Sequence, residues 1–597
     1  LTEEFEVNKA DQIDLLNRSV DYFKVNDKFE KEEFEKFAEI CELINSNQHL
    51  SRTGLEKIIK LVLKKLSIPV DVVLVEQAKG ENNGDYATNI AMVYAKKIRK
   101  DPKELAGEIV KLLEKEDIDF VDKIEIAGPG FINFYLTEDF FIKNIEKIIK
   151  EDIEYGKNDI RLGKNIIIEY TQPNPFKPFH IGHLMSNAIG ESISRIIEAS
   201  GASVIRANYQ GDIGLHVAKT IWAVNRLDFD VSDIERVGEA YVYGNSQYEE
   251  SEISKKEIIQ INKELYENDN KHKELYGIGR KTSLEHFEKL YKILGTKFDY
   301  YFFESETAEK GKQIVENNIG KVFEKSDGAV IFDGEKYGLH KRVFITSNGL
   351  PTYEAKEMGL AFLKREKIDY DLSITTTAVE QQEHFKVVFK ALSLIDNSFE
   401  GKLMHLPNGM MQFASGKMSS RKGNIITGES LINSVRKSAQ EKIKNTENLS
   451  EDISYDVAVA AIKYSILKNG VGKNIIFDEK KALSFEGDSG PYLQYTYARI
   501  QSILNKTSIT PSVDNPDKVT KLERILQRFP EVVMVANSEY EPSRVATYLV
   551  ELAQEFNSYY GKYKIIDNGY RLFLVKAVAI VIHNGMHLLG IETPDRM

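Results

Sequence analysis

The chain has 597 residues, of which 42% are hydrophobic and 29% charged, and its formal net charge is −12. This length is too great for one hydrophobic core, so we expect several domains. Proteins that coat nucleic acid nonspecifically are basic, so an RNA partner of this acidic chain would be bound selectively, through local basic surfaces. The single cysteine, Cys41, excludes an internal disulfide framework and a multi-cysteine metal site, and it fits a cytoplasmic compartment.

Four regions follow one another along the sequence. Residues 1–50 are charged and helical in pattern, and we interpret them as a helical extension of unknown role. Residues 51–150 alternate helical and strand-like stretches, which predicts an α+β domain. Residues 151–445 alternate strands and helices around a charged insertion at about 227–340, and residues 446–597 are helical in periodicity. The fold class is therefore a multidomain α/β protein with an all-helical C-terminal domain.

A strand, loop, helix and strand begin near residue 165. Asn165 to Tyr170 form an apolar run that suits a strand buried on both faces, and a Pro-Asn-Pro turn at 173–175 ends it. A helical pattern then runs to Gly201, and Ser203 to Asn208 form the next strand. This βαβ unit predicts a Rossmann-type parallel sheet, in which the loop after the first strand binds phosphate at a helix N-terminus.

The predicted phosphate loop contains two histidines. Lys177-Pro-Phe-His180-Ile-Gly-His183 places Gly182 between the imidazoles at the start of the helix. Glycine allows close approach of a nucleotide, and imidazole N–H groups can stabilise the negative charge that develops on an α-phosphate. Two ordinary polar residues at a helix start are the alternative, and the position at a strand-to-helix loop favours function.

A second candidate loop lies far downstream, at residues 416–424. Gly416-Lys-Met-Ser-Ser-Arg-Lys-Gly-Asn is polar and bounded by glycines, and its Lys417 could close over an ATP triphosphate. A basic surface loop is an equally good interpretation of this segment taken alone. The two segments together resemble the HIGH and KMSKS signatures of class I aminoacyl-tRNA synthetases, here His180-Ile-Gly-His183 and Lys417-Met-Ser-Ser-Arg421.

A wider resemblance to arginyl-tRNA synthetases covers roughly residues 75–597. Its other segments are Gly84 to Asn89, Ala127 to Asn133, Gly490 to Tyr495 and Leu588 to Met597. The resemblance implies an N-terminal domain that contacts the tRNA elbow and a helical anticodon-binding domain. It also implies catalytic roles for His180, His183, Lys417 and Lys177, and ATP contacts at the two histidines, Gly182, Lys417 and Ser419.

The resemblance also assigns an arginine pocket. Its residues in this sequence are Glu169, Asn174, Tyr353, Glu357 and Gln381. A planar, permanently charged guanidinium needs carboxylates in fixed geometry, so the glutamates suit this substrate. Each residue alone would be an ordinary polar side chain. Position 357 is Glu where the family usually has Asp, and the segment Gly211 to His216 lacks the family's tryptophan and glutamine.

The implied reaction has two steps. The arginine carboxylate attacks the α-phosphate of ATP with Mg²⁺ present, giving arginyl-adenylate and pyrophosphate, and a terminal ribose hydroxyl of tRNA(Arg) then takes the arginyl group. The family also implies that tRNA is needed for the first step. Candidate tRNA contacts in the C-terminal domain are Tyr492, Gln494, Tyr495 and Arg499. The expected partners are tRNA(Arg), L-arginine and ATP; a monomer is expected, and no membrane.

Two other functions compete with this one. A cysteinyl-type synthetase would need a zinc site, which a single cysteine makes hard to build. A noncatalytic RNA-binding protein derived from a synthetase would be indicated by loss of His180, His183 or Lys417, and all three are present.

Two further patterns concern the C-terminal region. The apolar stretch Phe573 to Ile591 is interrupted by Lys576 and polar residues, which predicts a buried helix and not a membrane span. One apolar helical face is predicted upstream of it, made of Val545, Tyr548, Leu549, Leu552, Phe556 and Tyr559.

Overall fold

A computed structural model shows two compact units, Leu1–Lys143 and Asn144–Met597. The structure describes residues 52–69, 72–78, 83–116, 118–267, 270–413, 427–443 and 451–597. The predicted helical extension at 1–50, Lys417 and Ser419 therefore lie outside the described residues.

The first unit contains an antiparallel sheet covered by helices. Its strands, in the order β1-β2-β4-β3, are Glu76–Gln77, Tyr86–Thr88, Phe131–Leu136 and Val121–Ala127. The helices are α3 (Arg52–Lys65), α4 (Ile90–Ile98) and α5 (Pro102–Leu113). Helix α5 begins where the Asp101 side chain accepts hydrogen bonds from two backbone N–H groups, with proline as its first residue. This arrangement has the α+β character predicted for the region.

The second unit is built on a five-stranded parallel sheet. The strand order is β12-β11-β5-β6-β7, and the strands are Leu403–Asn408, Leu372–Ala378, Asn165–Glu169, Ser203–Gln210 and Tyr300–Phe303. Strand β5 lies in the middle, and its isoleucines pair with both neighbours. Helix α7 (Ile181–Glu198) crosses from β5 to β6, which confirms the predicted βαβ unit. The strand order reverses between β5 and β11, so the carboxyl end of β5 is a topological switch point, where such sheets bind ligands.

The segment between β6 and β11 contains helices and a small antiparallel sheet. Helices α8 (Leu215–Leu227), α9 (Ile234–Glu250), α10 (Glu252–Tyr266) and α11 (Lys273–Ile293) precede β7. After β7 come α12 (Glu304–Asn317), strands β8 (Glu324–Ser326), β9 (Ala329–Phe332) and β10 (Arg342–Ile345), and α13 (Tyr353–Lys367). Strand β7 falls inside the interval 227–340 predicted as an insertion, yet it pairs with β6 in the main sheet. A four-residue strand surrounded by charged helices leaves too short a pattern to be recognised in the sequence.

Helices follow the sheet in the remaining part of the second unit. After α14 (Gln382–Ile395) and β13 (Met411–Phe413) come α15 (Gly428–Ile443), α16 (Glu451–Leu467), β14 (Ile475–Phe477) and α17 (Glu479–Ala482). The last helices are α18 (Gly490–Asn505), α19 (Lys521–Leu526), α20 (Phe529–Glu539), α21 (Ser543–Lys562) and α22 (Gly569–Leu588). Strand β14 pairs in parallel with β13, so the region predicted as helical also supplies one short strand.

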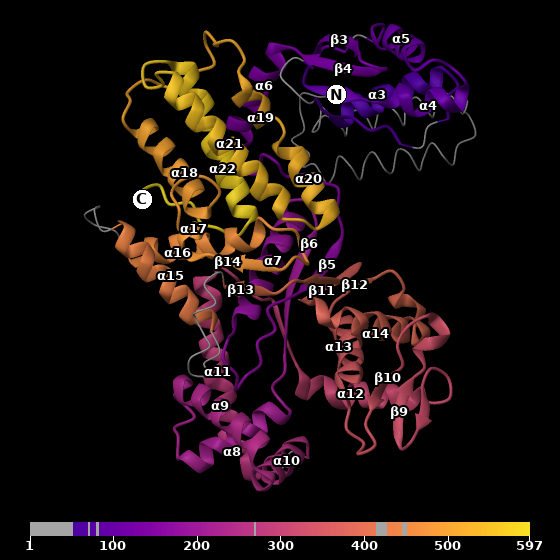
Figure 1. Cartoon of the computed structure of the whole chain (residues 1–597), viewed down its shortest axis with the longest axis vertical. Coiled ribbons are helices and arrows are strands. Elements are labelled where there is room, and N and C mark those ends of the chain that lie inside the picture. Colours follow the sequence, from indigo (N-terminus) through magenta and orange to yellow (C-terminus); the bar gives the residue numbers. More distant parts are fainter. Residues whose placement is uncertain are drawn as a thin grey trace, which may run out of the picture. The chain divides into compact units, whose positions relative to one another are not determined.

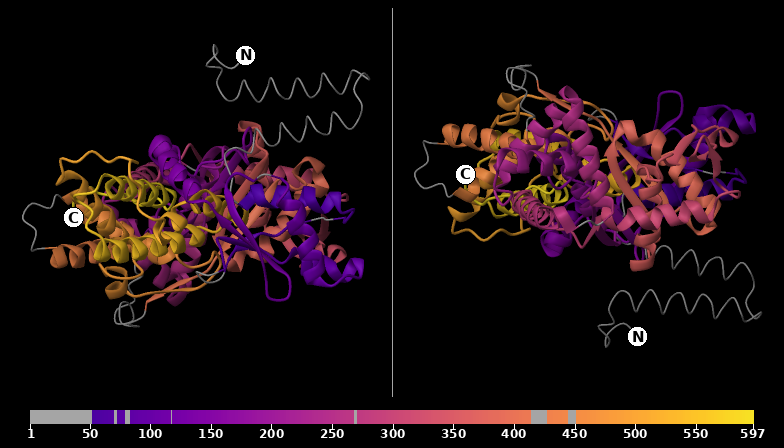
Figure 2. Two further views of the ribbon diagram at one scale, coloured as in Figure 1. Left: turned by 90° about the horizontal axis from the view of Figure 1, so that it is seen from above. Right: turned by 90° about the horizontal axis from the view of Figure 1, so that it is seen from below.

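Helices α21 and α22 pack side by side in the core of the helical region (Figure 1), and the orange-to-yellow helices also lie together in both views of Figure 2. The predicted apolar face of α21 is confirmed, because all six of its residues are buried. Helix α22 is long and apolar enough to cross a membrane, but 72% of its most apolar window is buried inside the protein, as expected of a core helix. The core of these helices is continuous with that around α7.

Candidate active site

The two histidines cap the N-terminus of α7 reciprocally. The His180 Nδ1 atom accepts a hydrogen bond from the Gly182 N–H at 3.1 Å, and the His183 Nδ1 atom accepts one from the His180 N–H at 3.2 Å. The imidazole rings stack with 3.5 Å between their centroids. A Cβ atom at Gly182 would lie 2.9 Å from His180 Cε1, so only glycine leaves room for this ring.

The capping bonds fix the tautomer of both imidazoles. Desolvation and the charge of nearby Lys177 lower the pKa of His180. Burial, with the same lysine and His180 adjacent, places the pKa of His183 well below its usual value. Both rings are therefore neutral near pH 7, and because each Nδ1 is an acceptor, each proton is on Nε2. The turn presents two Nε2–H donors at the positive end of a helix dipole.

A cavity of 780 Å³ opens beside the histidine turn. Its lining is Lys177, Pro178, Phe179, Ile234, Glu235, Val237, Gly238, Glu239, Val242, Tyr243, Ser246, His286, Thr427, Glu429 and Ser430. Thr427 forms a β-bridge with His180, and the Gly428 N–H donates to the Phe179 carbonyl at 2.6 Å. The chain therefore returns beside the histidines directly after the segment that contains Lys417 and Ser419. Burial lowers the pKa of Lys177, which lies at the cavity.

The loop between β5 and α7 has a strained backbone. Thr171, Gln172 and Phe176 have φ values of 74°, 53° and 65°, in the left-handed region that non-glycine residues avoid. Such conformations cost about 1–3 kcal/mol each and persist only where the surroundings impose them. The loop carries Asn174, whose Oδ1 atom accepts a hydrogen bond from the Gly211 N–H at 2.9 Å. This contact ties the predicted substrate residue to the segment after β6.

Two buried glutamates at the carboxyl edge of the sheet are paired with lysines. Glu169 ends β5, is fully buried, forms an ion pair with Lys364 and accepts a 2.5 Å hydrogen bond from Gln172 Nε2. Glu304 begins α12 directly after β7 and pairs with Lys356 at 2.6 Å. Glu304 could not be recognised from the sequence, because a glutamate at a helix start is common and only its place after β7 distinguishes this one.

A third glutamate completes the group. Burial and the neighbouring Glu169, with further repulsion from Glu304, raise the pKa of Glu357 well above its usual value, and Lys364 only partly opposes this. Glu357 and the predicted residue Tyr353 lie one turn apart on α13. Burial and Glu304 raise the pKa of the Tyr353 hydroxyl, although 62% of the side chain is exposed. Gln381 is exposed in the turn that follows β11, at the same edge of the sheet.

The segment Gly211 to His216, a departure from the family pattern, organises this edge. Asp212 is buried and accepts hydrogen bonds from Tyr276, Arg280 and Ser305, which fixes the positions of α11 and α12. His216 Nε2 contacts the Gly211 carbonyl at 2.8 Å. Burial, with Lys177 nearby, lowers the pKa of His216 to about 3, so the ring is neutral and donates this bond.

The predicted tRNA contacts on α18 divide into buried and surface residues. Gln494 is fully buried and its amide donates to the Asp456 and Glu592 carbonyls. Tyr492 is 8% exposed, and its hydroxyl accepts a bond from Asn557. The polar groups of these two residues therefore serve the packing of the helices, and direct RNA contact stays a prediction for them.

The other two α18 candidates reach the surface. The Tyr495 side chain is 38% exposed, and Arg499 donates to the Tyr495 hydroxyl at 3.1 Å. The Arg499 guanidinium also lies over the Tyr495 and Tyr560 rings, 4.7 and 5.7 Å from their centroids.

Three family models match the chain. Residues 144–479 match "tRNA synthetases class I (R), catalytic domain", residues 493–597 match "DALR anticodon binding domain", and residues 53–136 match "Arginyl tRNA synthetase N terminal domain". The parallel sheet with its histidine-capped helix and the first of these matches define the catalytic domain of a class I aminoacyl-tRNA synthetase.

Similar proteins of known name identify the family within this class of synthetases. The chain is 32% identical over 567 residues to an arginine–tRNA ligase of Clostridium perfringens, covering 90% of this chain and 99% of the relative. It is 33% identical over 545 residues to the Streptococcus uberis protein of that name, covering 88% and 96%. The arginyl-tRNA synthetase of Thermus thermophilus superposes with a TM-score of 0.75 at 25% identity, covering 92% of this chain and all of that one. The chain belongs to the arginyl-tRNA synthetase family.

Proposed function

We infer that this chain is an arginine–tRNA ligase, which activates L-arginine with ATP to arginyl-adenylate and transfers the arginyl group to tRNA(Arg). Family membership supports the activity. The observation that carries the chemistry is the placement of two neutral imidazole donors and three glutamates along one edge of the parallel sheet.

The histidine turn would bind the phosphates of ATP. His180 and His183 present Nε2–H groups whose hydrogen bonds strengthen as charge grows on the α-phosphate. Lys177 adds a cation near the same place. Lys417 and Ser419 are proposed, from the family resemblance, to contact the triphosphate. The β-bridge between His180 and Thr427, the first described residue after Ser419, supports this.

The glutamate group would bind the arginine guanidinium. Glu169, Glu304 and Glu357 carry three negative charges when ionised, and Lys356 and Lys364 supply two positive ones. Three minus two leaves one excess negative charge, which matches one guanidinium. An arginine bound there would find Tyr353, Asn174 and Gln381 at the same edge, to line the pocket and hold its α-groups.

The remaining elements would handle the metal and the tRNA. No group of three or more histidine, cysteine or acidic side chains able to hold a metal occurs among the residues that the structure describes. These residues therefore do not fit a resident metal ion, and we expect Mg²⁺ to arrive bound to the phosphates of ATP. Tyr495 and Arg499 remain the proposed tRNA contacts of α18, and the terminal 2′-OH of tRNA would attack the adenylate. We expect a cytoplasmic monomer.

The test is arginine-dependent exchange of pyrophosphate into ATP, measured with and without tRNA(Arg). Exchange that needs both arginine and tRNA would support the activity and a tRNA-dependent first step. A folded protein that binds tRNA(Arg) but gives no exchange and no charging would instead be the noncatalytic RNA-binding alternative. Cysteine in place of arginine should give no exchange.

A further inference from the structure

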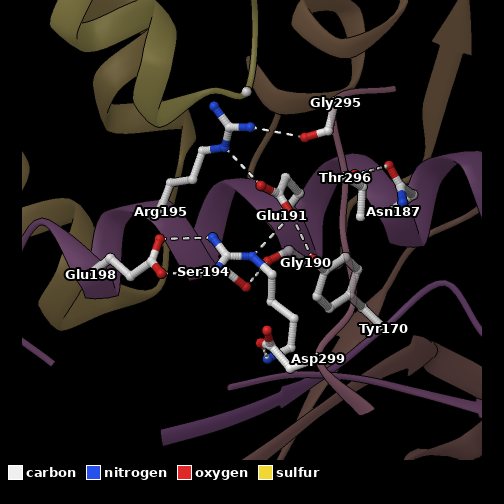
Figure 3. Close-up of polar contacts among 12 residues, drawn as sticks. Tyr170, Asn187, Gly190, Glu191, Ser194, Arg195, Glu198, Gly295, Thr296 and Asp299 are labelled. Atoms are coloured by element: carbon white, nitrogen blue, oxygen red, sulfur yellow. Dashed lines mark hydrogen bonds and ion pairs between the residues drawn. The ribbon is translucent and has the colours of Figure 1, made fainter. Parts of the chain in front are cut away.

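Helix α7, which starts at the histidine turn, has a buried carboxylate halfway along it. The Glu191 side chain accepts hydrogen bonds from Tyr170 Oη at 2.5 Å and from Arg195 Nε at 2.7 Å (Figure 3). It accepts a third from Arg206 Nε at 3.3 Å. Burial alone would raise the pKa of Glu191, but Arg206 and Arg195 hold it below its usual value. Glu191 is therefore an ionised group with three donors, only 3% exposed, that the proposed chemistry does not use.

One side of this cluster holds the end of the C-terminal helix α22. Arg195 donates from one guanidinium nitrogen to the His587 carbonyl at 3.1 Å and from the other to the Gly295 carbonyl at 2.9 Å. Ser192, next to Glu191, donates to the Leu588 carbonyl at 2.8 Å. The end of α22 thus rests on the same turn of α7 that carries the carboxylate.

A fully buried lysine strengthens this attachment. Lys463 on α16 donates to the Gly590 carbonyl and to the Leu294 carbonyl, both at 2.7 Å. The residues just beyond α22 are thereby tied to the end of α11, which leads into β7 of the main sheet.

The other side of the cluster holds the strained substrate loop. Tyr170 directly precedes Thr171 and Gln172, which are two of the three residues with left-handed backbones in this loop. The Tyr170 ring lies directly against α7, because a Cβ atom at Gly190 would be only 2.2 Å from Tyr170 Cγ. Thr171 is held from the same helix, since its Oγ1 atom accepts a hydrogen bond from Asn187 at 3.0 Å.

The strained loop leads directly to the proposed arginine contacts. Gln172 donates to Glu169 at 2.5 Å, and Asn174 accepts from the Gly211 N–H. A shift of Tyr170 would therefore move the residues that are proposed to hold the amino acid. Glu191 contacts both this tyrosine and Arg195, so a single carboxylate joins the loop to the end of α22.

We propose that Glu191 is a positioning residue that makes the arginine-binding loop respond to the seating of α22 on α7. A tRNA bound to the helical domain would then change arginine affinity through Arg195, Glu191 and Tyr170, with no contact between these side chains and either substrate. The proposal rests on the inferred ligase function. It adds to that function a physical connection between the helical domain and the substrate loop.

The experiment measures the dissociation constant of arginine with and without tRNA(Arg), whose ratio is the coupling factor. In the wild type we expect a factor of roughly 5 to 150 in favour of the tRNA-bound enzyme. Tyr170→Phe removes only the hydroxyl at the loop end, whereas Arg195→Met removes the donors to Glu191, to the His587 carbonyl and to the Gly295 carbonyl. Each should reduce the coupling factor roughly 2- to 30-fold.

The matched control is Tyr570→Phe in the helical domain. Tyr570 is also buried and also donates its hydroxyl to a glutamate, Glu523, at 3.1 Å. It lies at the beginning of α22, whereas the residues of α22 that contact Arg195 and Ser192 lie at the end of that helix. Loss of the Tyr570 hydroxyl should lower the melting temperature of the protein about as much as Tyr170→Phe does. It should leave the coupling factor unchanged. A purely structural role of Glu191 predicts similar effects of all three variants.

The outcomes separate the proposal from the ligase function. A wild-type coupling factor of one, or a factor that Tyr170→Phe and Arg195→Met leave unchanged, would overturn the proposal even if the enzyme charges tRNA normally. Absence of both exchange and charging in the wild type would refute the function itself. A reduced factor in the two α7-contact variants, with a normal factor in Tyr570→Phe, would support the proposal.

Discussion

Arginine binding should release a proton from Glu357. Burial and the charge of Glu169 raise the pKa of Glu357 in the free enzyme, so the carboxyl is protonated over a pH range above its usual value of 4.5. A bound guanidinium would favour the ionised form and lower the pKa again. Within this window the dissociation constant of arginine should fall up to about tenfold per pH unit, which is about 1.4 kcal/mol.

Calorimetry of arginine binding in buffers of different ionisation enthalpy measures the released proton directly. The variant Glu357→Gln has no proton to release, so its arginine affinity should not depend on pH in this window. At higher pH it should bind arginine roughly 10- to 150-fold more weakly than the wild type, because a hydrogen bond to a charged group contributes about 1.5–3 kcal/mol. Its apo form should not be less stable, since the neutral amide replaces a carboxyl whose ionised form is disfavoured by burial and by Glu169.

Glu354→Gln provides the control on the same helix. Burial tends to raise the pKa of Glu354, but its contact with His384, 3.4 Å away, holds the pKa below the usual value. Glu354 is therefore ionised in the window and should contribute nothing to proton release. Equal proton release by the wild type and Glu357→Gln would refute the assignment of Glu357 to the guanidinium.

Three further substitutions test other parts of the site. His183→Asn keeps an acceptor for the His180 N–H but loses the Nε2–H donor, so the rate of ATP–pyrophosphate exchange should fall roughly 10²- to 10³-fold. An unchanged rate would exclude a contact between the His183 Nε2–H group and the transition state. Lys364→Met leaves Glu169 buried without its cation and should lower the free energy of unfolding by about 3–5 kcal/mol, whereas adding Glu169→Gln should recover much of this in urea titrations. His216 takes up a proton near pH 6.5 in the unfolded chain but only near pH 3 in the folded protein. Its contribution to the free energy of unfolding therefore falls by up to about 1.4 kcal/mol per pH unit as the pH drops from 6.5 towards 3. His216→Gln should remove one proton from this pH dependence, and an identical slope in the variant would contradict the assignment.

The sequence by itself determined the local parts of this protein. The apolar run at 165–170, the turn after it and the helical pattern to Gly201 predicted a βαβ unit, and the structure has it as β5, α7 and β6. The apolar face of α21 and the burial of α22 were also predictable. These features depend on residues close together in the chain, whose spacing records which side of an element is buried.

Only the tertiary structure decided which distant residues meet and in what chemical state. Glu304 joins Glu169 because β7 pairs beside β6, and Gln494 is fully buried because other helices cover it. The Nε2–H tautomer of the histidines depends on backbone donors, and the raised pKa of Glu357 depends on carboxylates from other elements. Solvation, protonation and pairing are properties of the surroundings of a side chain, and those surroundings exist only once strands distant in sequence have been placed side by side.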